Sequence, residues 1–326
     1  MITRLIKRVI ILVCLIFFLV GCNLAERHSD ENLRGELIVF HAGSFSLPIK
    51  ALADSFRKTN PDVTFKLEAA GSIESIRKIT ELGRSCDVLI SADYKVIDNL
   101  LIPQFASWNI PFAGNEMVIV YQDKSRLADK ININNWFDIL VNKDVAFGRS
   151  DPYSDPCGYR TVITLKLAEK YYKRIDIAEI ILRKDNSFIR PKEVDLLALL
   201  ETNTVDYIFS YKSVALQHGL RYLELPTEIN LSETGMDSIY KSVSVEVKGE
   251  TPQSAITVYW EPVVYGVTIP RNTPNTKLAL EFVRFLLSES GGQAIISVMG
   301  QTPVVPSVTL TYDSIPELLK EFALKK

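Results

Sequence analysis

The chain has 326 residues, which is enough for two domains of ordinary size. Apolar residues make up 47% and charged residues 23%, a mixture that is typical of folded globular proteins and excludes a largely disordered chain. There are 37 lysines and arginines against 39 aspartates and glutamates, so the net charge of −2 excludes the strongly basic surface of a nucleic-acid-binding protein. The three histidines and four cysteines are too few and too scattered to predict a metal site made of these residues.

The first 22 residues have the layout of an export signal. Basic residues (Arg4, Lys7 and Arg8) precede an unbroken apolar run, Val9–Val20, which is too short to span a bilayer comfortably. The run ends in the letters LVGC, which resemble the lipobox of bacterial lipoproteins. In that class of signal the cysteine, here Cys22, receives a diacylglycerol and becomes the mature N-terminus. A plain signal peptide or a short membrane anchor is the alternative.

We therefore expect residues 1–21 to be a lipoprotein signal peptide. Residues 22–35 are mostly polar and aperiodic, which indicates a flexible tether. The rest of the chain is then expected in the cell envelope, lipid-anchored on the periplasmic or extracytoplasmic face of a membrane. An oxidising compartment would permit a disulfide between Cys86 and Cys157, but the sequence does not show that they approach each other.

The first half of the remaining chain alternates between short apolar runs and amphipathic stretches. This pattern predicts, in chain order, a strand at 37–40, a helix at 47–57, a strand at 63–67, a helix at 73–82 and a strand at 87–90. Strand–helix–strand units in series imply right-handed crossovers and a parallel sheet with helices on both faces.

The second half repeats this α/β alternation. We expect strands at 116–121, 145–147 and 207–209, helices at 135–140, 159–172, 194–201 and 276–288, and a β-rich stretch at 259–269. Because no linker separates the two units, they are predicted to be lobes joined by chain crossings near 116–121 and 264–269. We expect one lobe from 36–116 plus 267–326 and the other from 117–266. Ligands of such sheets bind in the crevice at the carboxyl ends of the strands.

Three loops rich in small residues fall where such a crevice is expected: His41–Ser46, Ala69–Ser72 and Ser150–Gly158. Free N–H groups at helix starts favour an anion, although the serines and aspartates could also be ordinary helix caps. His41 lies three residues before Ser44, but no G-x-S-x-G elbow, P-loop or dinucleotide fingerprint is present, so we do not predict an enzyme.

Several motifs together resemble the tungstate- and molybdate-binding proteins of ABC importers, the WtpA and archaeal-type ModA family. They are, in the family's order, FHAGS, AAGS, DPCGYRT, LLALLE, YKSVA and VYGVTIP. The resemblance runs from about Leu37 to Pro306. It implies an α/β periplasmic-binding-protein fold of type II, with two lobes, a mixed, mainly parallel sheet in each, and two crossing segments. It also implies an oxyanion ligand held between the lobes, no further cofactor, and an ABC permease with its ATPase as partners of a monomer.

The resemblance also implies which residues bind the oxyanion. The family's positions match Gly43, Ser44, Ser72, Asp155, Pro156, Cys157, Glu193 and Tyr211. Glu193 is matched by its spacing to the helix at 194–201, and Asp195 is its rival.

Two carboxylates beside a dianion make sense only if their oxygens bind the metal centre itself. Two unit charges about 4 Å apart repel by about 4 kcal/mol at an effective dielectric constant near 20. Hexavalent tungsten or molybdenum can accept two further hard oxygen ligands, here from Asp155 and Glu193, and become six-coordinate, whereas sulfate cannot readily expand in this way. A protein of the same fold that binds sulfate, phosphate or another oxyanion is the alternative, and an exported enzyme on this fold is a more distant one.

Overall fold

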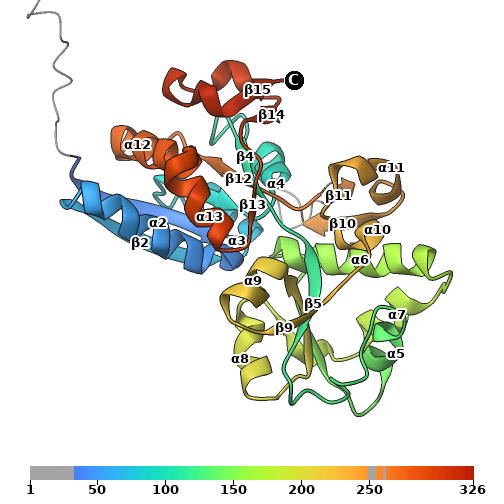
Figure 1. Cartoon of the computed structure of the whole chain (residues 1–326). Helices are drawn as coiled ribbons and strands as arrows, with labels where there is room; N and C mark the ends of the chain where they lie inside the picture. Colours follow the sequence, from blue (N-terminus) through green and yellow to red (C-terminus); the bar gives the residue numbers. More distant parts are fainter. Residues whose placement is uncertain (1–32, 249–254, 260–261) are drawn as a thin grey trace, which may run out of the picture. The chain divides into compact units, whose positions relative to one another are not determined.

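Two large β-sheets, two small two-stranded sheets and the helices around them make up the part of the chain that the structure describes (Figure 1). The structure is a computed structural model that describes residues 33–248, 255–259 and 262–326. The expected signal peptide, Cys22 and most of the expected tether lie outside these ranges. Residues Arg34–Lys326 form one compact unit. Within the described ranges, no helix combines the length and the apolar character needed to cross a bilayer.

The first sheet has the strand order β13-β4-β12-β3-β1-β2. Its strands are β1 (Gly35–Ala42), β2 (Val63–Ala70), β3 (Val88–Ser91), β4 (Ile110–Gly114), β12 (Val264–Thr268) and β13 (Thr302–Pro303). Strand β1 runs parallel to β2 and β3, whereas β12 runs antiparallel to β3 and β4. The carboxyl ends of β1 and β2 therefore lie side by side, and the first two small-residue loops follow them.

Amphipathic helices cover this sheet. They are α2 (Ser46–Thr59), α3 (Ser72–Thr80), α4 (Tyr94–Leu100), α12 (Thr276–Leu287) and α13 (Ala294–Val298), followed by the short strands β14 (Ser307–Thr309) and β15 (Ala323–Lys325). Helix α2 buries Ile49, Leu52 and Phe56, which recur at helical spacing, and the ring of Phe56 packs edge-on against Phe282 of α12. This aromatic contact joins the beginning and the end of the described chain into one core.

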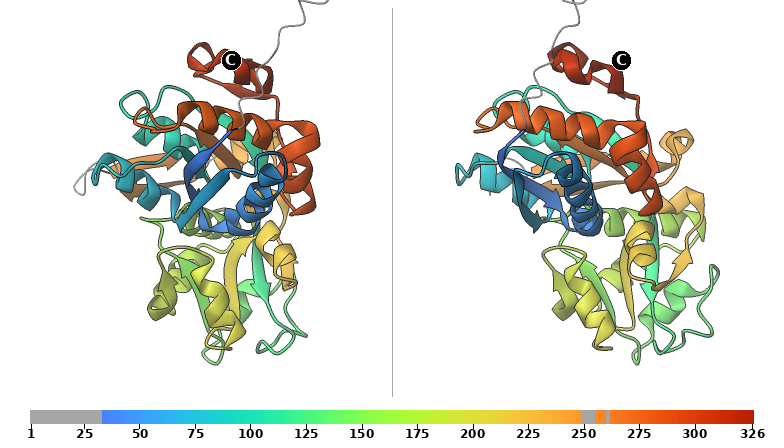
Figure 2. Two further views of the ribbon diagram at one scale, coloured as in Figure 1. Left: turned by 90° about the vertical axis from the view of Figure 1, so that its left-hand side faces the viewer. Right: turned by 60° about the vertical axis from the view of Figure 1, so that its left-hand side comes forward.

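The second sheet has the order β7-β6-β8-β5-β9. Its strands are β5 (Met117–Tyr121), β6 (Phe147–Ser150), β7 (Ile189–Arg190), β8 (Tyr207–Tyr211) and β9 (Arg221–Glu224), and a separate hairpin is formed by β10 (Ser244–Lys248) and β11 (Ala255–Tyr259). The helices are α5 (Trp136–Val141), α6 (Pro156–Tyr171), α7 (Ile177–Arg183), α8 (Asp195–Glu201), α9 (Lys212–Gln217), α10 (Thr227–Asn230) and α11 (Asp237–Tyr240). Figure 2 shows these green and yellow elements grouped around their own sheet.

The chain passes from the first sheet to the second over very few residues. Strand β4 ends at Gly114 and β5 begins at Met117, so the outward crossing is Asn115–Glu116. Strand β12 belongs entirely to the first sheet and begins at Val264, so the return precedes Val264 and does not extend to 266. Strand β12 is an inner strand of the first sheet, between β3 and β4.

The mixed character of both sheets is confirmed, but parallel pairing predominates in neither, since the described strands of the second sheet combine two parallel pairs with two antiparallel ones. Among the described strands of the first sheet, β4, β12 and β13 all pair antiparallel with their neighbours. The reason is the crossing topology, because β4 leads out of this lobe and β12 returns to it, and the two lie side by side. The strand expected at 145–147 is β6, Phe147–Ser150, so it reaches further towards the third small-residue loop.

Cys86 and Cys157 do not form a disulfide. Both thiols are free and buried, and they contact different parts of the molecule. The Sγ of Cys86 lies 3.2 Å from the carbonyl oxygen of Val88 in the first sheet, whereas the Sγ of Cys157 lies 3.7 Å from that of Phe209 in the second. Burial raises the pKa of Cys86 to about 12, so this thiol remains protonated and unreactive at neutral pH.

Candidate functional site

The first predicted loop follows β1 as a single turn, Gly43–Phe45, that leads into α2. The side chain of Ser44 is buried, and its hydroxyl oxygen accepts a hydrogen bond of 2.7 Å from the hydroxyl of Tyr265. A Cβ atom added to Gly43 would lie 3.3 Å from each carboxylate oxygen of Glu193 and 2.9 Å from a methyl group of Val194. The backbone of this loop therefore directly faces the start of α8 in the other lobe.

His41 precedes this turn, and its side chain is buried. Its Nδ1 atom lies 2.9 Å from the carbonyl oxygen of Ala42, and burial lowers the pKa of the ring to about 4. The unfolded chain binds a proton near pH 6.5 and the folded chain only near pH 4, so acidification between these values favours unfolding.

We expect this difference to cost the folded protein roughly 3 kcal/mol as the pH falls from 7 to 4. Glutamine at this position does not titrate, so His41→Gln should flatten that part of the pH profile. Urea denaturation of both proteins across the range measures the effect. Parallel profiles for the two proteins would show that His41 does not carry this acid sensitivity.

The second predicted loop joins β2 to α3. Ser72 is fully buried, and its hydroxyl oxygen accepts a hydrogen bond of 2.9 Å from the backbone N–H of Ala92. Gly71 lies against the other lobe, because a Cβ atom there would be only 2.2 Å from the carbonyl oxygen of Ser154. The second and third loops thus touch backbone to backbone.

The third predicted group lies at the start of α6, which begins with Pro156. Asp155 is buried but does not cap its own helix. Its Oδ2 accepts a hydrogen bond of 2.9 Å from the backbone N–H of Glu193, and no described group donates to its Oδ1. Cys157 lies in the first turn of α6 and is fully buried.

Glu193 lies next to Asp155, just before α8. Its side chain is only 1% exposed, and neither carboxylate oxygen accepts a hydrogen bond from any group in the described ranges. Burial raises the pKa of both carboxyl groups, and the adjacent Asp155 raises the pKa of Glu193 further. Unpartnered carboxylate oxygens at this depth are costly, so they point to a ligand that supplies the missing bonds.

Asp195, the rival of Glu193, occupies a different environment. Its side chain is 38% exposed and lies 3.4 Å from the ammonium group of Lys192. The structure therefore brings Glu193, and not Asp195, into contact with Asp155 and the first loop.

Tyr211 completes the predicted set at the end of β8. It is fully buried, and its hydroxyl oxygen accepts a hydrogen bond of 2.8 Å from the guanidinium group of Arg160 in α6. Arg160 also donates a hydrogen bond of 2.7 Å to the carbonyl oxygen of Ala92, and the N–H of Ala92 in turn donates to the hydroxyl of Ser72. A single arginine thus links predicted site residues of both lobes.

Five residues around the site were not among those predicted from the sequence: Arg160, Tyr159, Asp93, Tyr265 and Asn115. The hydroxyl of Tyr159 donates a hydrogen bond of 2.6 Å to a carboxylate oxygen of Asp93, and the guanidinium group of Arg160 lies 3.4 Å from the same oxygen. Helix α6 is thus hydrogen-bonded to the first lobe. Arg160 and Tyr159 lie within the DPCGYRT motif, which was the only signal of their importance. Asn115 lies in the outward crossing, whereas Tyr265 lies in β12, within the VYGVTIP motif.

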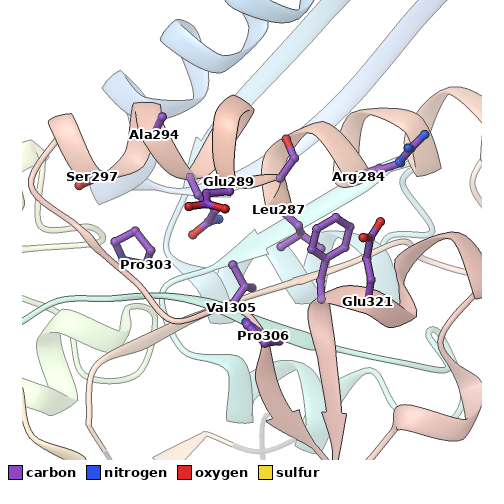
Figure 3. Close-up of a pocket in the computed structure, with 12 residues that line it drawn as sticks. Arg284, Leu287, Glu289, Ala294, Ser297, Pro303, Val305, Pro306 and Glu321 are labelled. Carbon is purple, nitrogen blue, oxygen red and sulfur yellow. The ribbon is translucent and has the colours of Figure 1, made fainter.

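Other surface features lie away from these residues. A groove of about 720 Å³ runs between α12, α13 and the C-terminal segment, and it is lined by residues such as Leu287, Val305 and Glu321 (Figure 3). None of the predicted site residues lines it. Among the described residues, no group of three or more histidine, cysteine, aspartate or glutamate side chains is placed to hold a metal ion.

Comparison with known proteins identifies the family to which this chain belongs. The profile of the bacterial extracellular solute-binding proteins matches residues 37–300, which is most of the chain. This chain belongs to that family. Membership in this solute-binding family indicates a binding and transport role outside the cytoplasm.

Two relatives of this solute-binding protein cover nearly its whole length. A solute-binding protein of Petrotoga mobilis is 46% identical over 295 residues, which are 90% of this chain and 91% of the relative. The molybdate/tungstate-binding protein WtpA of Pyrococcus abyssi is 40% identical over 333 residues, with coverage of 94% and 95%.

A solved structure with the same architecture is the periplasmic molybdate-binding protein of Azotobacter vinelandii. It shares 17% identity with this solute-binding protein and superposes with a TM-score of 0.59 over 82% of this chain and 98% of its own. The predicted two-lobed periplasmic-binding-protein fold is thereby confirmed.

Proposed function

We propose that this chain is the solute-binding component of an ABC importer and that it binds tungstate or molybdate between its two lobes. The named relative from Pyrococcus abyssi supports this ligand class. The observation that carries the proposal is the buried pair Asp155 and Glu193: Oδ1 of Asp155 and both carboxylate oxygens of Glu193 have no hydrogen-bond partner among the described residues, and those of Glu193 lie next to Gly43 in the first loop. We propose lobes of 36–116 with 264–326, and of 117–263, a division that follows the two sheets.

The two carboxylates would serve as ligands of the metal centre. A dianion beside Asp155 and Glu193 meets strong like-charge repulsion, which only direct oxygen–metal bonds offset. Tungsten(VI) and molybdenum(VI) are hard centres that accept oxygen ligands and expand from four to six neighbours. Sulfate cannot gain these bonds, so the same pair of carboxylates that binds tungstate would reject the commoner anion.

The four oxygens of the anion would accept hydrogen bonds from both lobes. The donors are the hydroxyls of Ser44 and Ser72 on one side, and the hydroxyl of Tyr211 with the backbone N–H of Cys157, which follows Pro156 at the start of α6, on the other. Gly43 would let the first loop approach the anion closely. Backbone N–H groups at a helix start and the helix dipole both favour an anion.

Because donors come from both lobes, the ligand would favour the closed form of the protein. A ligand shifts a hinge equilibrium by the difference in its affinity for the two forms. The contacts of Tyr159 with Asp93 and of Gly71 with Ser154 support the interpretation that the described arrangement is closed. The closed carrier would then dock on a permease that an ATPase drives.

Isothermal titration of the purified mature chain tests the proposal. We expect tight, saturable binding of tungstate and of molybdate that about a hundredfold excess of sulfate or phosphate does not weaken. Competition by sulfate at equal concentration would instead favour a general oxyanion carrier of the same fold.

We further propose that the mature protein is a monomer tethered to the membrane by a lipid on Cys22. The lipobox-like LVGC and the polar stretch that follows it support this anchor. We expect Cys22→Ser to move the protein from the membrane fraction to the soluble fraction of expressing cells. Retention of the variant in the membrane fraction would argue against lipidation at this cysteine.

A further inference from the structure

The hydroxyl groups of the proposed site share one arrangement. A hydroxyl has a single proton to donate and two lone pairs that accept. Ser44 accepts from Tyr265, Ser72 accepts from the N–H of Ala92, and Tyr211 accepts from Arg160. In each case a fixed donor occupies a lone pair, so the hydroxyl's own proton remains available for another acceptor.

The donor to Ser44 is itself held in place. Asn115 lies in the outward crossing. Its Nδ2 atom donates a hydrogen bond of 3.3 Å to the hydroxyl oxygen of Tyr265 and one of 2.7 Å to the hydroxyl of Ser213 in α9. Because an amide nitrogen only donates, the hydroxyl of Tyr265 acts as acceptor towards Asn115 and as donor towards Ser44. The hydrogen bonds therefore run in one direction, from Asn115 in the crossing through Tyr265 to Ser44 in the first loop.

We propose that Tyr265 is a positioning residue for the oxyanion, which acts through Ser44. By donating to the oxygen of Ser44, it directs the Ser44 proton towards the ligand and prevents the hydroxyl from turning into the protein. Tyr265 is fully buried between Phe45, Phe112 and Tyr211, so its hydroxyl cannot move far from this direction. The inference rests on the proposed function, because it concerns the orientation of a donor in that site.

Binding of tungstate to Tyr265→Phe tests the inference. This change removes the hydroxyl and keeps the ring, so we expect the dissociation constant for tungstate to rise about tenfold, the effect of one hydrogen bond to a charged group. The matched control is Tyr207→Phe, which removes another buried hydroxyl, one that donates 2.6 Å to the carbonyl oxygen of Arg126 within the second lobe. This control should bind tungstate as the wild type does.

A double-mutant cycle with Ser44→Ala separates positioning from a general structural effect. If Tyr265 acts through Ser44, the double variant should bind tungstate as weakly as Ser44→Ala alone. Additive losses, or wild-type affinity in Tyr265→Phe, would overturn the inference. Failure of the wild-type protein to bind tungstate would instead contradict the proposed function, so the two failures are distinguishable.

Discussion

Tungstate binding is expected to fall by two orders of magnitude or more when Asp155→Asn and Glu193→Gln are combined. Each change keeps the shape of the side chain but removes the anionic oxygen that would bind the metal centre. Asparagine can still accept the hydrogen bond from the N–H of residue 193, so the local backbone is preserved. If the oxyanion were held by hydrogen bonds alone, removing two negative charges would make it bind more tightly. Whether the affinity for tungstate falls or rises therefore distinguishes the two modes of binding.

The same double variant should fold at least as stably as the wild type in the absence of ligand. Both carboxyl groups are 1% exposed, and their unpartnered oxygens make burial of their charge costly. Isothermal titration and thermal denaturation measure the two effects separately. Asp195→Asn is the matched control, because its carboxylate is partly exposed beside Lys192, and it should leave tungstate affinity unchanged. Unaltered or tighter tungstate binding by the double variant would contradict the coordination by carboxylates.

Gly71→Ala is expected to prevent full closure and to weaken tungstate binding by roughly a hundredfold. The φ and ψ angles of Gly71, −59° and 145°, suit any residue, so alanine introduces no backbone strain. Its Cβ atom would lie 2.2 Å from the carbonyl oxygen of Ser154 and 3.2 Å from that of Pro191, and both of these belong to the second lobe. The clash is with backbone atoms, which cannot rotate away.

Because this clash exists only between the lobes, each lobe should fold normally in Gly71→Ala. We expect the melting temperature without ligand to stay near that of the wild type, whereas the compaction on adding tungstate, measured by small-angle X-ray scattering, should be lost. Gly235→Ala serves as the control, because a Cβ atom there meets no heavy atom within 4 Å. Normal compaction and affinity in Gly71→Ala would show that the ligand does not require this close approach.

Local periodicity was sufficient to predict the principal elements. Helix α2 was recognisable because Ile49, Leu52 and Phe56 recur at helical spacing, and β1 because it contains the short apolar run 37–40. Strand β4 was missed because it contains Pro111, and β9 because its sequence, RYLE, carries charged residues at both ends. The antiparallel part of the first sheet depends on how the chain crosses between the lobes, which no local pattern contains.

The candidate site, too, could be predicted only in part from the sequence. The loops after β1 and β2 and the start of α6 stand out by their small residues, and family resemblance placed Glu193 beside them. The contacts that orient their side chains join residues far apart in the chain, as do Tyr265 and Ser44, which are separated by 221 positions. Such pairs are visible only once the fold brings β12 beside the first loop.

X-ray absorption at the tungsten edge of the protein with bound tungstate measures the number of oxygen neighbours directly. If Asp155 and Glu193 bind the metal centre, the spectrum should show six oxygens, four from the anion and two at longer distance from the protein, and the two longer ones should disappear in the double variant. A tungsten atom with only its four original oxygens in the wild-type complex would contradict the proposed role of the two carboxylates.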